Sequence, residues 1–283
     1  PVTHPDLTIF LWDSKSTGIK MAHPSWTTDD YLQYGLINGF NTDRYKTQFM
    51  NALYMIDLHK DMAVYWIPDA KNVPHYRTVT PLRTILNWWM NDHKRFILHA
   101  ASVGLPGGGV VITNKAGSGK STTALSCIGS GLKFSGDENC LVALEPEPYA
   151  YSLYCSGTLE AGDIDRVPKL APYLSNGSKL HIEKAIYLFN DDHQKLMIKG
   201  FPIKAILIPS ISGKDDTIIR MKATNPPLLA LAPGSLFQLP GVGGDYLSSL
   251  AELIKRVPSY SLELGTQIDQ IPHVIESFIR SQI

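Results

Sequence analysis

A glycine-rich segment at residues 116–121 restricts the folds that this 283-residue chain can adopt. It follows the apolar run Gly109-Val110-Val111-Ile112-Thr113, which predicts a buried strand, and it opens a helical pattern from residue 120 to about 130. A strand, a glycine-rich loop ending in Gly-Lys-Ser and a helix together form the context of a phosphate-binding P-loop. The sequence therefore predicts an α/β domain built around this loop. The alternative is a Gly-Ser loop that only caps an ordinary helix.

This loop predicts which residues would hold a nucleotide. Its glycines let backbone N–H groups turn inward around phosphate oxygens, and the helix N-terminus adds partial positive charge. Lys120 would reach the terminal phosphates of ATP, and the Ser121 hydroxyl would ligate Mg²⁺. Asn114 departs from the GxxxxGK[ST] pattern, which has glycine there, but Asn tolerates left-handed backbone angles better than most residues. The predicted ATP-binding residues are Ala116, Gly117, Ser118, Gly119, Lys120, Ser121 and Thr122.

An acidic pair, Asp137 and Glu138, follows a short predicted strand at residues 132–135. In P-loop proteins an acidic residue at the end of such a strand holds the metal ion. We expect one carboxylate, with Asp137 as the candidate, to ligate Mg²⁺ and the other to accept a proton from an attacking hydroxyl. A solvated acidic turn is the alternative.

His99 is a third candidate catalytic residue, in the run Leu98-His99-Ala100-Ala101. The apolar stretch 95–101 predicts a strand, and neighbouring side chains on a strand point to opposite faces. A histidine in such a strand is commonly a core residue with a satisfied hydrogen bond. Its place ahead of the P-loop and the acidic pair favours a catalytic role.

The order of these motifs resembles the catalytic domain of HPr kinase/phosphorylase, whose fold is related to phosphoenolpyruvate carboxykinase. The C-terminal half is similar to a branch of that family that includes the kinases of lasso-peptide precursors. The resemblance covers roughly residues 75–283. It rests on residues 98–101, 109–113, 116–125 and 136–138, and on Pro81-Leu82-Arg83 and the segments 201–209, 230–235 and 257–265.

This resemblance implies an ATP- and Mg²⁺-dependent kinase that phosphorylates a Ser hydroxyl of a peptide or protein, such as a ribosomally made lasso precursor. It implies that Lys120 and Ser121 hold the phosphates and Mg²⁺, that Asp137 and Glu138 supply metal ligation and the general base, and that His99 positions the transferring phosphoryl group. The family's acidic pair is commonly Asp-Asp, so the identity of the base stays open. The glycine-rich signature of phosphorolysis is missing, which favours kinase activity alone. A kinase for a small metabolite and a non-catalytic nucleotide sensor are the alternatives.

The remaining sequence predicts a two-domain organisation. Residues 1–75 read as a small β-rich domain with strands at 8–12, 52–58 and 63–67, a candidate for substrate recognition, and residues 76–283 read as the catalytic domain, entered through a helix at 81–90. Loop carboxylates Glu160, Asp163 and Asp165 could face the site but more often lie in solvated loops. The same holds for Arg83, Arg166 and Arg256, which are more often structural than phosphate ligands.

Composition limits the partners. Lys plus Arg and Asp plus Glu number 26 each, so no basic excess points to nucleic acid. No apolar run reaches the roughly 18–20 residues of a membrane span. The N-terminal residues lack a signal-peptide pattern, and three cysteines without CxxC spacing fit a reducing compartment, so we expect a cytoplasmic protein. The sequence leaves open whether the chain is a monomer or a homo-oligomer.

Overall fold

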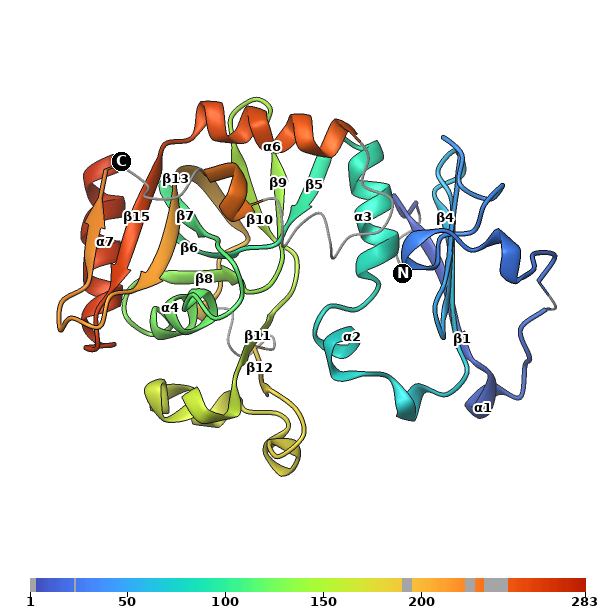
Figure 1. Cartoon of the computed structure of the whole chain (residues 1–283), viewed down its shortest axis with the longest axis horizontal. Coiled ribbons are helices and arrows are strands. Elements are labelled where there is room, and N and C mark those ends of the chain that lie inside the picture. The colour runs from blue at the N-terminus through green and yellow to red at the C-terminus, as the bar shows by residue number, and fades with distance from the viewer. Residues whose placement is uncertain (1–3, 23, 190–194, 222–226, 232–243) are drawn as a thin grey trace. The chain divides into compact units, whose positions relative to one another are not determined.

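The computed structural model in Figure 1 describes residues 4–22, 24–189, 195–221, 227–231 and 244–283. These residues divide into two compact units, an N-terminal one that ends at Lys94 and a C-terminal one that starts at Arg95. The sequence placed the boundary at residue 75, ahead of the helix Arg83–Asp92 (α3). That helix groups with the N-terminal unit because its buried Ile85 and Trp88 belong to the core of that unit.

A four-stranded sheet organises the described part of the N-terminal unit. Its strands are β1 (Thr8–Asp13), β2 (Tyr45–Phe49), β3 (Leu53–Asp57) and β4 (Met62–Ile67), in the order β1-β4-β3-β2. Only the β1–β4 pair is parallel. Short helices lie at Ser14–Thr17 (α1) and His75–Val79 (α2). The predicted strands at 8–12, 52–58 and 63–67 are confirmed.

The C-terminal unit is mixed α/β, and its main sheet has nine strands among the described residues. Seven of them run in the order β5-β9-β10-β13-β7-β6-β8, while β15 pairs with β13 and β14. The β7–β13 and β13–β15 pairs are parallel, and the other pairs are antiparallel. The strands are β5 (Arg95–Leu98), β6 (Ala101–Leu105), β7 (Gly108–Ile112), β8 (Lys133–Gly136), β9 (Cys140–Ala143), β10 (Tyr149–Ser152), β13 (Gly200–Ile211), β14 (Ile218–Arg220) and β15 (Ser259–Leu264).

Three longer helices and a second, two-stranded sheet complete the described part of this unit (Figure 1). The helices are α4 (Lys120–Ser126), α6 (Gly244–Arg256) and α7 (Gln270–Gln282), and the small sheet pairs β11 (Ser156–Leu159) with β12 (Ala185–Leu188). Between those two strands the chain forms 3₁₀ turns at Ala161–Arg166, Pro168–Tyr173 and Gly177–Lys179.

The central strand β7 is fully buried, as its run of glycine and β-branched residues predicts for a strand inside a sheet. Val110 and Ile112 join one core cluster with α4 and α7. On α7 the buried Ile271, Ile275 and Ile279 recur every four residues, so one stripe of the helix packs inward. The glycine-rich loop therefore leaves the sheet from a strand that is buried along its whole length.

The predicted bounds of two elements are wrong. The strand expected over 95–101 breaks after Leu98 and resumes at Ala101, so His99 lies in a bend between β5 and β6. The helix expected to reach about residue 130 ends at Ser126. The helices predicted near the C-terminus, at 246–256 and 271–283, are confirmed as α6 and α7. The segment 230–235 lies outside the described residues beyond Leu231.

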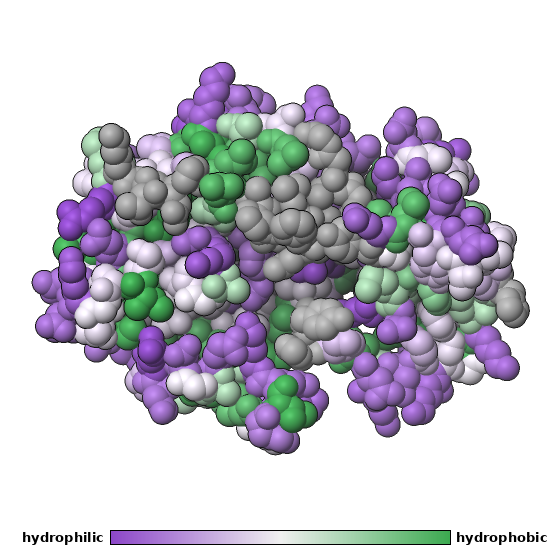
Figure 2. Space-filling view, viewed as in Figure 1, coloured by the Kyte–Doolittle hydropathy of each residue, from purple (hydrophilic) through white to green (hydrophobic). Residues whose placement is uncertain are grey.

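The visible surface of both units is dominated by hydrophilic residues with smaller hydrophobic patches between them (Figure 2). Such a mixture is usual for a globular protein, because a folded chain cannot cover its surface with polar atoms alone. In the part of the chain that the structure describes, no helix combines the length and the apolar character needed to cross a bilayer.

Candidate functional site

The glycine-rich loop follows β7 and turns into α4 through two glycines with positive φ. Gly117 has φ 75° and Gly119 has φ 93°, a region that side chains disfavour. At Gly119 a Cβ would also lie 2.5 Å from Leu264 Cδ1. The loop backbone therefore favours glycine at this position because of its dihedral angle, and a larger residue would also displace the end of the Leu264 side chain.

Asn114 anchors the start of the loop. Its side-chain Nδ2 donates to Pro209 O on β13 at 2.8 Å, and its Oδ1 accepts from Lys115 N at 2.8 Å. Asn114 is not among the described residues with positive φ. The expectation that it replaces glycine by adopting a left-handed conformation is therefore wrong, and its amide instead ties the loop to the sheet.

Lys120 is buried at the start of α4, and its ammonium is turned back onto the loop. Nζ donates to Asn114 O at 2.7 Å and to Lys115 O at 3.1 Å. An ammonium has three N–H donors, so these two bonds leave one for a ligand. Burial lowers the pKa of Lys120, while the charges of Glu138 and Asp137 oppose that change.

Asp137 lies at the end of β8 and is held at both oxygens. Oδ1 accepts from Ser121 Oγ at 2.9 Å and Oδ2 accepts from Thr158 N on β11 at 3.0 Å. Its residue surface is only 3% exposed. Burial, reinforced by the neighbouring Glu138 charge, raises the pKa of Asp137 to about 6, although both hydrogen bonds favour the ionised form.

Glu138 follows in a three-residue turn that is closed by Asn139 N donating to Asp137 O at 2.6 Å. Its φ of 61° is unusual for a residue with a side chain, and such strain is concentrated at functional sites. The turn directs the two carboxylates differently. Glu138 Oε1 accepts from Thr158 Oγ1 at 3.3 Å, and Oε2 lies 3.8 Å from His99 Nδ1.

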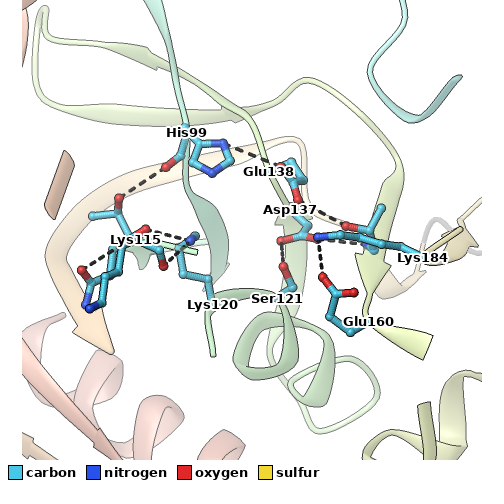
Figure 3. Close-up of polar contacts among 11 residues, drawn as sticks. His99, Lys115, Lys120, Ser121, Asp137, Glu138, Glu160 and Lys184 are labelled. Carbon is cyan, nitrogen blue, oxygen red and sulfur yellow. Dashed lines mark hydrogen bonds and ion pairs between the residues drawn. The ribbon is translucent and has the colours of Figure 1, made fainter. Parts of the chain in front are cut away.

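His99 faces Glu138 across the site, as Figure 3 shows. Its side chain is 11% exposed, and its backbone oxygen accepts from Thr113 Oγ1 at the end of β7. The interruption of the strand between β5 and β6 is what brings this residue to the acidic pair. The alternation of faces along a continuous strand, on which its prediction was argued, does not apply.

A pocket of about 300 Å³ joins these groups. Nearly all of the sequence-predicted site residues line it, and Ser118, which is buried within the loop, is the exception. Of the weaker sequence candidates, Glu160, Asp163 and Arg166 also line the pocket. The lining residues that were predicted are His99, Ala116, Gly117, Gly119, Lys120, Ser121, Thr122, Asp137 and Glu138.

Sequence reasoning missed three polar residues of the pocket, Thr123 on α4, Thr158 on β11 and Lys184, which directly precedes β12. Thr158 contacts both carboxylates of the acidic pair, and Lys184 Nζ pairs with Glu160 Oε1 at 2.9 Å. No motif marks Thr158 or Lys184, because their contribution depends on how a distant β-pair lies beside α4 and β8.

The donor set fits a Mg²⁺ ion that also binds phosphate. Among the described residues no three His, Cys, Asp or Glu side chains gather as a metal cluster. Magnesium, however, commonly uses only one or two protein oxygens and completes its shell with phosphates and water. Asp137 and Ser121 are two such oxygen donors, already 2.9 Å apart. The glycine-rich loop lines the same pocket beside them.

Comparison with known proteins adds little to this geometry. No protein-family model matches the sequence, and no curated protein matches it. Among solved structures the chain is similar to the Hpr(Ser) kinase/phosphatase from Coxiella burnetii, with 14% identity and a TM-score of 0.36, over 65% of this chain and 94% of that one. At this TM-score the likeness carries no argument about the fold or the reaction. The proposal for the reaction rests on the geometry of the site.

Proposed function

We propose that this chain is an ATP- and Mg²⁺-dependent kinase with a catalytic unit of the HPr kinase type, which phosphorylates a Ser hydroxyl of a peptide or protein. One observation carries the proposal. A single pocket contains a glycine-rich loop with its lysine, a Ser–Asp oxygen pair and a second carboxylate beside a histidine. Phosphoryl transfer needs charge neutralisation, an oriented acceptor and a base, and little covalent chemistry from the protein.

The geometry supports separate roles for the two carboxylates. Asp137 is fixed by Ser121 and Thr158, so it suits metal ligation together with the Ser121 hydroxyl. Glu138 is one methylene longer and its side chain is 29% exposed in the pocket, so it suits the general base that takes the proton of the acceptor hydroxyl. Bound Mg²⁺ would supply charge neutralisation at the phosphates.

Lys120 and His99 complete the assignment. The Lys120 ammonium lies against the loop carbonyls, from which it would reach the terminal phosphates of ATP. His99 lies 3.8 Å from the Glu138 carboxylate, so it would orient the base and position the transferring phosphoryl group. The backbone of residues 116–122 would hold the phosphate oxygens through its N–H groups.

The proposed acceptor is a peptide hydroxyl. The sequence resemblance to the kinases of lasso-peptide precursors supports a Ser in a ribosomally made precursor peptide. The N-terminal unit, with its own sheet and core, is then the candidate for recognition of that peptide. A small metabolite remains the competing acceptor for the same chemistry.

Labelled ATP tests the proposal directly. The full chain is incubated with γ-labelled MgATP and peptides that carry an acceptor Ser, and we expect label on the peptide. Lys120→Ala should abolish transfer and shift the melting temperature only slightly, because the ammonium faces the loop carbonyls and not the apolar core. Lys169→Ala, at an exposed position outside the pocket, is the matched control. Normal turnover in Lys120→Ala would refute the P-loop assignment. ATP binding without transfer to any hydroxyl would instead indicate a nucleotide sensor.

A further inference from the structure

A second ammonium lies in the pocket, contributed by Lys184, which directly precedes β12. In the β11–β12 ladder Leu159 pairs with Ala185 in antiparallel register, so the next residues outward, Glu160 and Lys184, are cross-strand neighbours. Their ion pair measures 2.9 Å. Figure 3 shows the Lys184 side chain reaching toward Asp137 and Glu160, on the same site as Ser121.

Lys184 is electrostatically part of the catalytic centre. Burial acts to lower its pKa, but the hydrogen bond and charge of Glu160, followed by the charges of Glu138 and Asp137, raise the pKa above its ordinary value. Lys184 in turn contributes to lowering the pKa of Lys120. The two ammonium groups therefore act on the same small region, in which the transferring phosphoryl group would lie.

The ion pair between Lys184 and Glu160 can be broken at little cost. The Glu160 side chain is 68% exposed and that of Lys184 is 43% exposed. An ion pair between such exposed groups contributes little to stability, so exchanging it for another anion costs little. A phosphoryl group in transfer spreads its negative charge over three equatorial oxygens and offers that other anion.

We propose that Lys184 is a catalytic residue that leaves Glu160 and binds the phosphoryl oxygens during transfer. This inference rests on the proposed kinase function. In the step it serves, the bond between the γ-phosphorus and the bridging oxygen breaks, and its electron pair stays on the β-phosphate of ADP. The bond from the acceptor oxygen to phosphorus forms, and the acceptor proton passes to Glu138. Lys184 exchanges no atoms with the substrate, and its contribution is limited to stabilising negative charge.

The test separates a catalytic cation from a structural ion pair. Lys184→Gln and Glu160→Gln each remove the same ion pair. We expect Lys184→Gln to lower kcat by about 10²–10³-fold, the range for loss of one charge-stabilising group, with unchanged affinity for MgADP. Glu160→Gln should lose far less. Lys179→Gln is the matched control, because Lys179 pairs with Glu183 at 4.0 Å and does not line the pocket.

Binding of a transition-state mimic gives a second readout that needs no acceptor. Aluminium fluoride should tighten MgADP binding to the wild type, and Lys184→Gln should lose that gain. Equal losses in kcat for Lys184→Gln and Glu160→Gln, or an undiminished aluminium fluoride effect in Lys184→Gln, would overturn the role of Lys184 while leaving the kinase proposal intact. A wild type that binds neither MgATP nor MgADP would overturn both.

Discussion

Asp137→Asn should stabilise the metal-free protein while it removes activity. The wild-type carboxylate is buried and lies beside Glu138, and both facts disfavour its ionised form. Asparagine keeps the shape of the side chain. Its carbonyl oxygen can accept from Thr158 N, and its amide can donate to the Ser121 hydroxyl oxygen, so both hydrogen bonds survive with one reversed.

The size of the effect follows from the pKa of this group. The folded-state pKa of about 6 lies roughly two pH units above the ordinary value of 3.8. Each unit corresponds to about 1.36 kcal/mol, so the ionised carboxylate destabilises the folded state by about 3 kcal/mol. Because the pKa is raised on folding, the folded state binds more protons than the unfolded state between these two values. Stability therefore falls as the pH rises from about 4 to 6, and it levels off above.

Thermal unfolding in EDTA tests this reasoning at several pH values. At pH 8 Asp137→Asn should melt on the order of 6–12 °C above the wild type, at 2–4 °C per kcal/mol for a unit of this size. The difference should vanish near pH 4. Asp165→Asn, which neutralises an exposed carboxylate, should show no such pH-dependent difference. If Asp137→Asn melts below the wild type at pH 8, the hydrogen bonds to the carboxylate outweigh its burial, and the argument is wrong.

Two further variants test the roles of the neighbouring groups. Glu138→Gln should lower kcat by about 10²–10⁴-fold with MgATP still bound, measured by rapid quench alongside nucleotide titration, and a loss below tenfold would exclude Glu138 as the base. His99→Ala should reduce transfer strongly and shift the melting temperature only slightly. If stability instead fell by roughly 1–3 kcal/mol while the folded fraction kept its specific activity, His99 would be a core residue.

The sequence predicted the parts of the site that local patterns encode. The β7 strand and the start of α4 follow from glycine, β-branched and helical patterns, which act over a few residues. The bend that frees His99 was not predictable, because the residues around it from Phe96 to Ala101 are apolar and their periodicity carries no signal for a break. Thr158 and Lys184 were missed for a different reason. Their positions depend on packing between segments far apart in the chain.

Because Asn114 is anchored to β13, the glycine-rich loop loses its conformational freedom at folding and not at ligand binding. A loop that is held only by glycines keeps several conformations until a ligand orders it, and that ordering is subtracted from the affinity. Here the amide of Asn114 fixes the first turn of the loop to the end of a buried strand as soon as the sheet forms. The entropy of ordering that segment is lost during folding, so the nucleotide that we propose as ligand would meet a loop that is already in place.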